Sequence, residues 1–272
     1  MDFETIAYRV EASVAHLTLS RPARTNALNG RMLEEINAAM DLAEADASAK
    51  VVIVSGAGAA FSSGFDLKEQ MERRPTGFGQ WKPILRKDFD AVMRFWHCPK
   101  PTIAAVRGPC LAGAFELSLA CDMTIASETA FFGEPELKFG AGIVAMVLPW
   151  LVGPKVAKEI IYLGEDRLSV QRARELGIVN RIVADDALEA EAVLIARHLC
   201  AIDPNLLKLT KRAINQTLER QGMLEALEAA LAIDLEIEGP GSPDKMAFMD
   251  IARADGLKAA LAWRDARFPV RK

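Results

Sequence analysis

The chain has 272 residues, which is enough for one large domain or for one domain with an appended segment. Hydrophobic residues make up 51% and charged residues 26%, as in soluble globular proteins, and the net charge of −4 disfavours a nucleic-acid partner. The longest apolar stretch, 141–153, is too short to cross a bilayer and contains Pro149. The amino terminus lacks the basic start and apolar core of a signal peptide. We therefore expect a cytoplasmic protein with no membrane partner.

Strands alternating with helices are predicted over roughly the first 200 residues. Residues 6–20 predict two short strands, and the spacing of Leu33, Ile36 and Met40 predicts a helix after the loop at 21–30. Further buried strands are expected at four apolar runs, 51–56, 102–108, 123–127 and 177–183. This alternation predicts an α/β fold.

The character of the chain changes near residue 200. Asp203 followed by Pro204 predicts the start of a helix, residues 223–238 predict a second, and Ser242 predicts the start of a third. We therefore divide the chain into a core of residues 1–200, which carries the active site, and a helical region of residues 201–272. The apolar stripe on the second helix is expected to pack on the core or on a partner subunit.

The first segment suited to chemistry is the glycine-rich turn at 56–69, which leads from a strand into a helix starting at Asp66 or Leu67. Such a turn lets backbone N–H groups point at an anionic ligand. The alternative is a tight strand-to-helix connection in which Asp66 is only an N-cap.

The second segment, 107–122, repeats this pattern and carries Glu116 three residues after Gly113. In a helix, that spacing places Glu116 on the face above the free N–H groups of the first turn. A carboxylate buried alone among the apolar residues 113–126 would cost several kcal/mol. The structural alternative is a capping carboxylate satisfied by nearby backbone donors.

The third segment, 131–142, contains Glu134 and Glu136 on either side of Pro135. Proline restricts the preceding backbone, so both carboxylates are expected on a loop, and exposed loop glutamates are the alternative. Two N–H-rich turns together with glutamates in apolar surroundings point to an active site.

These segments, 61–69, 107–127 and 131–142, resemble the successive signature segments of the crotonase (enoyl-CoA hydratase/isomerase) superfamily. Residues 20–30 resemble its CoA-contacting loop, and residues 173–183 resemble its late helix–strand element. The likeness runs in order along essentially the whole chain. It implies a crotonase-like spiral of repeated ββα units with a C-terminal helical trimerisation region, and a homotrimer or a dimer of trimers.

The resemblance also implies an enolate of an acyl-CoA thioester, held by two backbone N–H groups. By position in the motifs these belong to Phe65 and Gly113. Family members that hydrate enoyl-CoA have glutamates where Glu116 and Glu136 fall, and the pair grips one water molecule. Isomerases of the family usually keep only the acid that matches Glu136, so the presence of Glu116 favours a hydratase.

Coenzyme A is implied as part of the substrate, with no separate cofactor and no metal. The residues that the resemblance assigns to the CoA substrate are Arg24, Ala27, Asp66, Leu67, Lys68 and Phe268. At the carboxyl end, Pro269 stands where the family usually has a basic residue, which leaves Arg271 or Lys272 as substitutes. Solvated surface charges are the alternative for Arg24 and Lys68.

Two segments depart from the family pattern. Ile143 and Val144 stand where a typical hydratase has a glycine-rich loop, so we expect an altered acyl preference, such as a cyclic or branched chain, and a shifted Glu136. Residues 71–90 are polar and contain glycine, and we expect a loop whose Phe78 and Trp81 line the acyl site or else pack on a mobile surface.

Three alternatives to a hydratase stay open at this stage. An enoyl-CoA isomerase or an acyl-CoA hydrolase would use the same scaffold, because one fold supports several chemistries. A non-catalytic binder of CoA or RNA would belong to another class. The acidic composition argues against RNA, and the two glutamates argue against an inactive scaffold.

Overall fold

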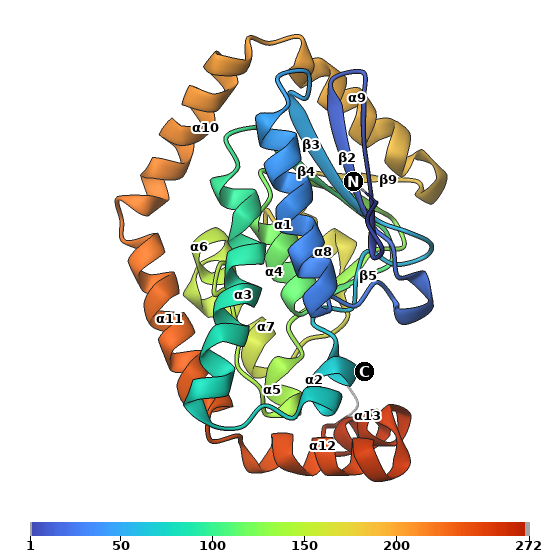
Figure 1. The fold of residues 1–272 in the computed structure, drawn as a ribbon, viewed down its shortest axis with the longest axis vertical. Coiled ribbons are helices and arrows are strands. Elements are labelled where there is room, and N and C mark those ends of the chain that lie inside the picture. Colours follow the sequence, from blue (N-terminus) through green and yellow to red (C-terminus); the bar gives the residue numbers. More distant parts are fainter. Residues whose placement is uncertain (1, 270–272) are drawn as a thin grey trace.

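A computed structural model describes residues 2–269 of the chain, and Figure 1 shows its arrangement. The strands are β1 Ile6–Glu11, β2 Val14–Leu19, β3 Val51–Gly56, β4 Thr102–Val106, β5 Pro109–Leu111, β6 Met123–Ser127, β7 Phe131–Gly133, β8 Leu168–Ser169 and β9 Arg181–Val183. The helices of the core are α1 Gly30–Ala45, α2 Leu67–Arg73, α3 Gly77–His97, α4 Gly113–Ala120, α5 Glu136–Phe139, α6 Leu148–Val152, α7 Pro154–Tyr162, α8 Val170–Glu175 and α9 Leu188–Cys200. The later helices are α10 Pro204–Glu219, α11 Met223–Glu238, α12 Pro243–Asp255 and α13 Leu257–Ala266, and short 3-10 turns cover η1 Pro22–Arg24 and η2 Asp185–Ala187.

The central sheet has six strands in the order β1-β2-β3-β4-β6-β9. Residues 6–20 form the two predicted strands, β1 and β2. These two strands pair antiparallel, and the remaining neighbours are parallel. The last predicted strand is shorter than expected, because β9 begins at Arg181 rather than at 177. Ile178 and Val179 are buried in the core ahead of it, so their apolar character reflects packing rather than strand pairing.

Helices cover both faces of this sheet. On β3, Val51 and Ile53 pack in one apolar cluster with Ala192 of α9, whereas Val52 and Val54 belong to the main core with α1, α3 and α4. Successive strand residues point to opposite faces, so a continuous β-branched run fills both layers. The predicted α/β architecture is therefore correct.

A second feature repeats along the chain and positions the site. Each of β3, β4 and β6 is followed by a short extended segment, centred on Ser62, on β5 and on β7. These segments lie parallel to one another, through the bridge from Ser62 to Cys110 and the pairing of β5 with β7. Each leads into a helix, α2, α4 or α5. The beginnings of three helices are thereby stacked at one end of the core.

The helical region begins at the two predicted N-caps, where the side chains of Asp203 and Ser242 accept hydrogen bonds from the N–H groups of Leu206 and Lys245. Helix α10 leads away from the core, α11 runs along α3, and α12 and α13 lie below α2 and α5 (Figure 1). Met223 and Leu227 of α11 are buried in the main core, as the predicted stripe requires.

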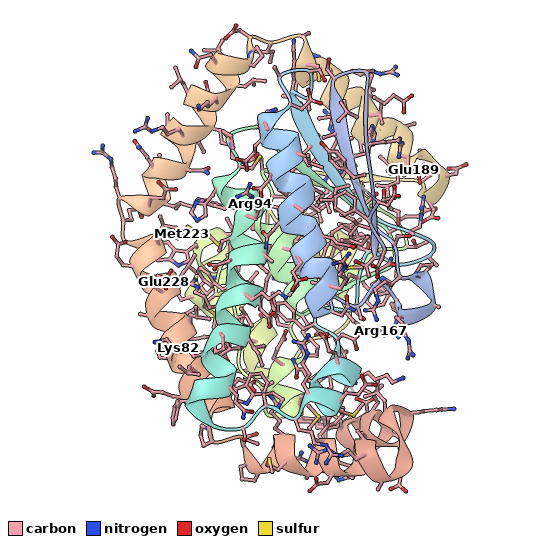
Figure 2. The ribbon with its side chains drawn as sticks, viewed as in Figure 1. Lys82, Arg94, Arg167, Glu189, Met223 and Glu228 are labelled. Carbon is pink, nitrogen blue, oxygen red and sulfur yellow. The ribbon has the colours of Figure 1, made fainter. Side chains whose placement is uncertain are left out.

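The expectation of a loop at residues 71–90 is wrong. This stretch contains the end of α2 and the first two-thirds of α3, with Pro83 inside the helix. Leu85 and Phe89 are buried one turn apart, and their apolar spacing outweighs the local polarity. At the seam of α3 and α11, Arg86 pairs with Glu228, labelled in Figure 2, at 2.9 Å.

Across residues 2–269, none of the helices combines the length and the apolar content that crossing a bilayer would require.

Candidate active site

A cavity of about 550 Å³ lies where the stacked helix starts meet the C-terminal helices. It is bounded by α2, α3 and α5 of the core and by α11, α12 and α13 of the helical region. The predicted site residues that line it are Arg24, Ala27, Phe65, Asp66, Leu67, Lys68, Glu116 and Glu136. The structure therefore brings together residues that lie more than 100 positions apart.

The first N–H-rich turn is held between two neighbouring segments. Gly64 has a φ of +87°, and a Cβ at this position would come within 2.6 Å of the Ala112 Cβ. The bridge to Leu28 uses the carbonyl of Gly64 and the N–H of Asp66. Because alternate groups of an extended chain point to opposite sides, the N–H of Phe65 faces away from Leu28.

The second turn lies directly against the first. Ala112 has φ 57° and ψ −137°, a backbone conformation that is strained for a residue with a Cβ. Its N–H donates to the Gly133 carbonyl at 2.8 Å, and Gly113 begins α4. A Cβ at Gly113 would overlap the ring of Phe65. Within residues 2–269, neither the Phe65 nor the Gly113 N–H has a hydrogen-bond acceptor.

Glu116 projects from the first turn of α4 and is only 1% exposed. Its carboxylate accepts hydrogen bonds from Val144 N at 3.2 Å and Ala145 N at 2.9 Å. The donors therefore come from the loop after α5 and not from the first turn of α4. Glu116 is not a capping residue of its own helix. These two backbone hydrogen bonds lower the free-energy cost of burying the Glu116 carboxyl group.

The expectation that Glu136 lies on a loop is wrong, because Glu136 is the first residue of α5. Pro135 precedes the helix in the N-cap position, where its fixed φ is compatible with a helix start. Carboxylate oxygens of Glu116, Glu134 and Glu136 lie within 4.8 Å of one another. Glu134 and Glu136 are buried, so the alternative of exposed loop glutamates is excluded.

Burial controls the proton affinity of this cluster. Desolvation raises the pKa of Glu116 well above its ordinary range, and the charge of Glu136 raises it further. Desolvation and the same neighbour also raise the pKa of Glu134. The pKa of Glu136 is raised by burial to about 7, although a hydrogen bond with Glu134 acts to lower it. Near neutral pH the cluster can therefore both release and accept a proton.

The three carboxyl groups are also spaced closely enough to hold a metal ion. Both oxygens of Glu116 already accept backbone hydrogen bonds, whereas Glu134 and Glu136 each keep one oxygen without a partner among the described residues 2–269. A hard divalent cation usually takes about six oxygen ligands. The expectation of no metal stays a prediction for a chelation experiment.

Exposed cations stand at the mouth of the cavity. Arg24 and Lys68 line it, as the sequence led us to expect, and Arg167 joins them over the ring of Phe131, 4.7 Å from its centroid (Figure 2). Asp66 caps α2 through Lys68 N and Glu69 N. Asp66 is therefore the N-cap of α2, as the structural alternative predicts, and it also lines the cavity.

Sequence reasoning missed several polar residues that line the same cavity. They come from α3, from the connection between α7 and β8, and from the C-terminal helices, and are Asp88, Asp166, Asp234, Glu238, Lys245 and Arg264. A usable signal was present in α11, because Asp234 and Glu238 continue the helical spacing of the buried Leu227 and Leu231. Acids on the apolar face of a helix are expected to face a site or a partner.

Phe268 does not line the cavity of its own chain. It is 38% exposed, and Lys138 Nζ lies 5.9 Å from its ring centroid. In the family this tail reaches the CoA bound to a neighbouring subunit, and the contact of Phe268 with CoA therefore stays a prediction. Arg271 and Lys272 lie outside the described residues.

Comparisons with known proteins agree with this arrangement. The sequence profile described as enoyl-CoA hydratase/isomerase matches residues 9–236. A probable enoyl-CoA hydratase of Rhizobium meliloti is 32% identical, with 100% of both chains covered. A short-chain-enoyl-CoA hydratase of Clostridium acetobutylicum is also 32% identical, covering 95% of this chain and 99% of that one.

Among solved structures, an enoyl-CoA hydratase/isomerase from Xanthobacter autotrophicus Py2 is 71% identical. The alignment covers 99% of this chain and 100% of that chain, with a TM-score of 0.98. The crotonase fold with its C-terminal helices, expected from the sequence motifs, is thereby confirmed. The chain belongs to the enoyl-CoA hydratase/isomerase family.

Proposed function

We propose that the protein is an enoyl-CoA hydratase that adds water across the 2,3 double bond of an enoyl-CoA thioester. The observation that carries this proposal is the meeting of Glu116 and Glu136 in one cavity, with carboxylate oxygens within 4.8 Å. When a water molecule is bound between two carboxyl groups of raised pKa, the ionised group can take a proton from the water while the protonated group gives its proton to the substrate.

In this mechanism, one carboxylate takes a proton from the water while the water oxygen bonds to C3. The electron pair of the C2–C3 double bond moves toward the thioester oxygen and forms an enolate. The other carboxyl group then gives its proton to C2, and the thioester carbonyl is restored. The pair of glutamates gains one proton and loses one, so its total charge is unchanged over the cycle.

The enolate oxygen is proposed to bind between the N–H groups of Phe65 and Gly113. Their adjacent turns and lack of acceptors within residues 2–269 support this role. Loss of one such donor typically slows a reaction about a hundred- to a thousand-fold. The phosphates of CoA are proposed to bind at Arg24 and Lys68, whose charges face solvent at the cavity mouth.

The decisive experiment is to incubate the protein with crotonyl-CoA, a 3-enoyl-CoA, and a saturated acyl-CoA, and to identify the products by chromatographic separation of the isomers and mass spectrometry. A hydratase converts crotonyl-CoA to a product heavier by one water. Conversion of the 3-enoyl-CoA alone would assign isomerase activity, and release of free CoA would assign a hydrolase. Binding of CoA without turnover, or a salt-dependent shift of RNA in a gel, would assign a non-catalytic binder.

We also propose a homotrimer or a dimer of trimers. Helix α10 exposes Leu206, Leu209 and Ile214, with exposed fractions of 50–63%. Large apolar side chains gathered on one helix favour contact with another protein surface. Analytical ultracentrifugation measures the assembly, and a monomer at micromolar concentration would contradict this proposal. The cytoplasm stays our proposed compartment.

A further inference from the structure

The part of the cavity between α3 and α11 is not a plain hydrocarbon pocket. Asp234 of α11 lines it and is only 2% exposed, and neither carboxylate oxygen has a hydrogen-bond partner in residues 2–269. Asp88 of α3 also lines it and is 7% exposed. An alkyl chain in this space would leave the Asp234 carboxyl group without a partner, which is a costly arrangement in a water-excluded site.

The nearby cation does not satisfy Asp234. Lys245 Nζ pairs with Glu238 and lies 4.1 Å from the centroid of the Trp81 ring. Its charge stabilises Asp234 only at longer range. The backbone of Gly142 packs directly against Asp234, but its N–H donates to Glu238 at 3.2 Å. The unpartnered oxygens of Asp234 are thus left for a group that enters the cavity.

We propose that the α3–α11 wall binds a hydroxyl group on the acyl chain, remote from the thioester, so that hydroxylated enoyl-CoA thioesters are the substrate class. This inference rests on the proposed function, because it concerns the acyl end of the same site. Asp234 of α11 is the binding residue, and Asp88 of α3 lines the same cavity.

A hydroxyl group fits these surroundings better than an ammonium group. Lys245 already supplies a positive charge beside Asp234. Burial raises the pKa of Asp88 to about 7 and that of Asp234 to about 6, so both side chains are partly protonated near neutral pH. A hydroxyl both donates and accepts hydrogen bonds and matches either protonation state.

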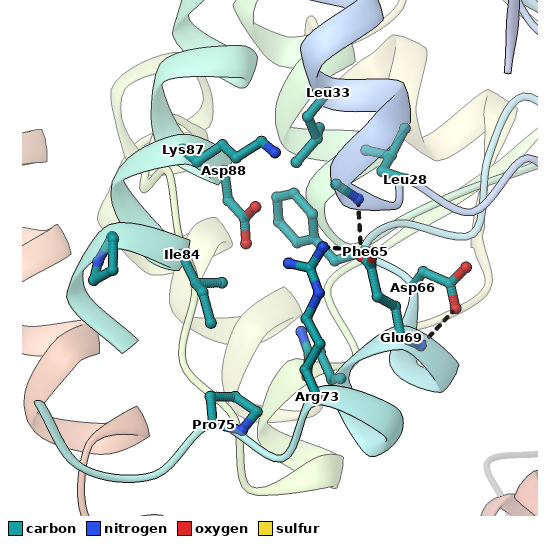
Figure 3. Close-up of a pocket in the computed structure, with 13 residues that line it drawn as sticks. Leu28, Leu33, Phe65, Asp66, Glu69, Arg73, Pro75, Ile84, Lys87 and Asp88 are labelled. Carbon is teal, nitrogen blue, oxygen red and sulfur yellow. Dashed lines mark hydrogen bonds and ion pairs between the residues drawn. The ribbon is translucent and has the colours of Figure 1, made fainter. Parts of the chain in front are cut away.

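A second cavity borders the same wall. A smaller cavity of about 230 Å³ shares Phe65 and Asp88 with the main one. Figure 3 shows the Asp88 carboxyl group and the Phe65 ring facing this space, with Leu33 and Ile84 around it. Asp88 and Asp234 line the main cavity together with Phe65, so an acyl chain that starts at the Phe65 turn can reach both acidic side chains.

Binding is tested with saturated thioesters, which cannot be hydrated. Calorimetry compares ω-hydroxyacyl-CoA esters, from 4-hydroxybutanoyl-CoA to 8-hydroxyoctanoyl-CoA, with their alkyl counterparts. At least one hydroxylated ester is expected to bind about tenfold more tightly than its alkyl counterpart, as for a hydrogen bond to a charged group. Asp234→Ala is expected to abolish this preference, and Asp234→Asn, which keeps a hydrogen-bonding side chain, to retain most of it.

Glu236→Gln is the matched control, because Glu236 is an exposed acid on the same helix. It is expected to bind every ester as the parent does. Equal binding of hydroxylated and alkyl esters throughout the series overturns the inference. Tighter binding of 6-aminohexanoyl-CoA than of 6-hydroxyhexanoyl-CoA also overturns it, in favour of a cationic acyl group. Circular dichroism of each variant identifies a loss that comes from misfolding, and the preference of the parent for hydroxylated over alkyl esters then decides the question.

Turnover separates this inference from the proposed function. Hydration of hex-2-enoyl-CoA without any preference for 6-hydroxyhex-2-enoyl-CoA leaves the hydratase proposal intact and counts against the hydroxyl site. Preferential binding of hydroxylated esters without hydration of any enoyl-CoA supports the hydroxyl site and contradicts the hydratase proposal. The expected result is a higher kcat/KM for the hydroxylated enoyl-CoA in the parent and not in Asp234→Ala.

Discussion

Asp234 Oδ1 occupies the space that a Cβ at Gly142 would need. The loop that contains Gly142 continues to Val144 and Ala145, whose N–H groups hold Glu116. Helix α11 is thus packed against the same backbone that positions a candidate catalytic carboxyl group. A side chain at position 142 would have to displace either the loop or the helix.

The substitution Gly142→Ala is therefore expected to lower both stability and crotonyl-CoA hydration, with overpacking costing about 1–3 kcal/mol. Adding Asp234→Ala removes the overlapping carboxyl group and should restore part of the loss. Thermal unfolding and turnover measure the two effects. Gly79→Ala is the control, since nothing lies within 4 Å of a Cβ at this position. If the double variant is no better than Gly142→Ala alone, the steric explanation is wrong.

Glu116→Gln and Glu136→Gln are each expected to lower crotonyl-CoA hydration at least about a hundred-fold, because an amide cannot exchange protons with the bound water. Steady-state kcat measures this effect. Glu159→Gln, at an exposed position on α7, is the matched control and should behave as the parent. Near-parental turnover in either of the first two variants would refute the role of that glutamate.

The same two variants should differ in stability. At position 116 the amide NH2 would face a backbone N–H of Val144 or Ala145, and an unmatched buried donor costs about 1–3 kcal/mol. Glu136 Oε2 has no such partner within residues 2–269, so Glu136→Gln should lose less free energy of unfolding than Glu116→Gln. Denaturant titrations at one pH provide the comparison.

Glu134 is expected to hold its proton and to donate it in a hydrogen bond to Glu136. Glu134→Gln keeps a donor and should retain activity close to that of the parent. Glu134→Leu removes the donor, so the pKa of Glu136 should rise and the acidic limb of the kcat/KM profile should move to higher pH. Superimposable profiles for the two variants would contradict this interpretation.

Stability is expected to fall as the pH rises from about 4 to 7. Burial raises the pKa of Asp88 from 3.8 to about 7 in the folded chain, so folding favours its protonated form. The stabilisation is fully present below the unfolded pKa and is lost as the pH rises through the folded pKa. Asp88→Asn should therefore gain stability relative to the parent between about pH 4 and 7, by up to a few kcal/mol.

Asp90→Asn is the control for this pH dependence, because Asp90 lies on the same helix, is exposed and pairs with Arg86 at 3.1 Å. Urea unfolding at a series of pH values measures the free energy of unfolding. A slope that Asp88→Asn leaves unchanged would show that another group is responsible, and Asp234 and Glu136 have pKa values raised in the same direction.

Removal of metal ions is expected to leave crotonyl-CoA hydration unchanged. The backbone donors of Val144 and Ala145 already engage both oxygens of Glu116, which a cation at this cluster would also need. Dialysis against EDTA followed by assay tests this expectation, with readdition of Mg²⁺ and Mn²⁺ as the complementary measurement. Activity that is lost on chelation and returns with one cation would assign a metal to the three glutamates.

Local features of the sequence were sufficient for much of the architecture. The β-branched runs at 51–56 and 123–127 coincide with β3 and β6, and Asp203 and Ser242 cap the helices that they were expected to start. These signals depend on neighbouring residues in the chain, through side-chain periodicity and hydrogen bonds to the next turn. The resemblance to the crotonase motifs then supplied the order in which these elements close into a spiral.

Other features were wrong or missed because they depend on distant contacts. The polar residues 71–90 are helical since Leu85 and Phe89 find an apolar surface on the core. The start of α5 at Glu136 likewise depends on the pairing of β7 with β5. The backbone preference of Pro135 alone does not reveal this pairing. Propensity over a short window cannot anticipate such partners.

The amino-acid order by itself determined where strands, helix starts and candidate carboxyl groups lie along the chain. Only the tertiary structure decided which donors hold Glu116, that Glu134 joins the pair, and that Asp234 from α11 enters the same cavity. The physical reason is that burial and charge depend on what fills the space around a side chain. Those neighbours come from segments that only folding brings together.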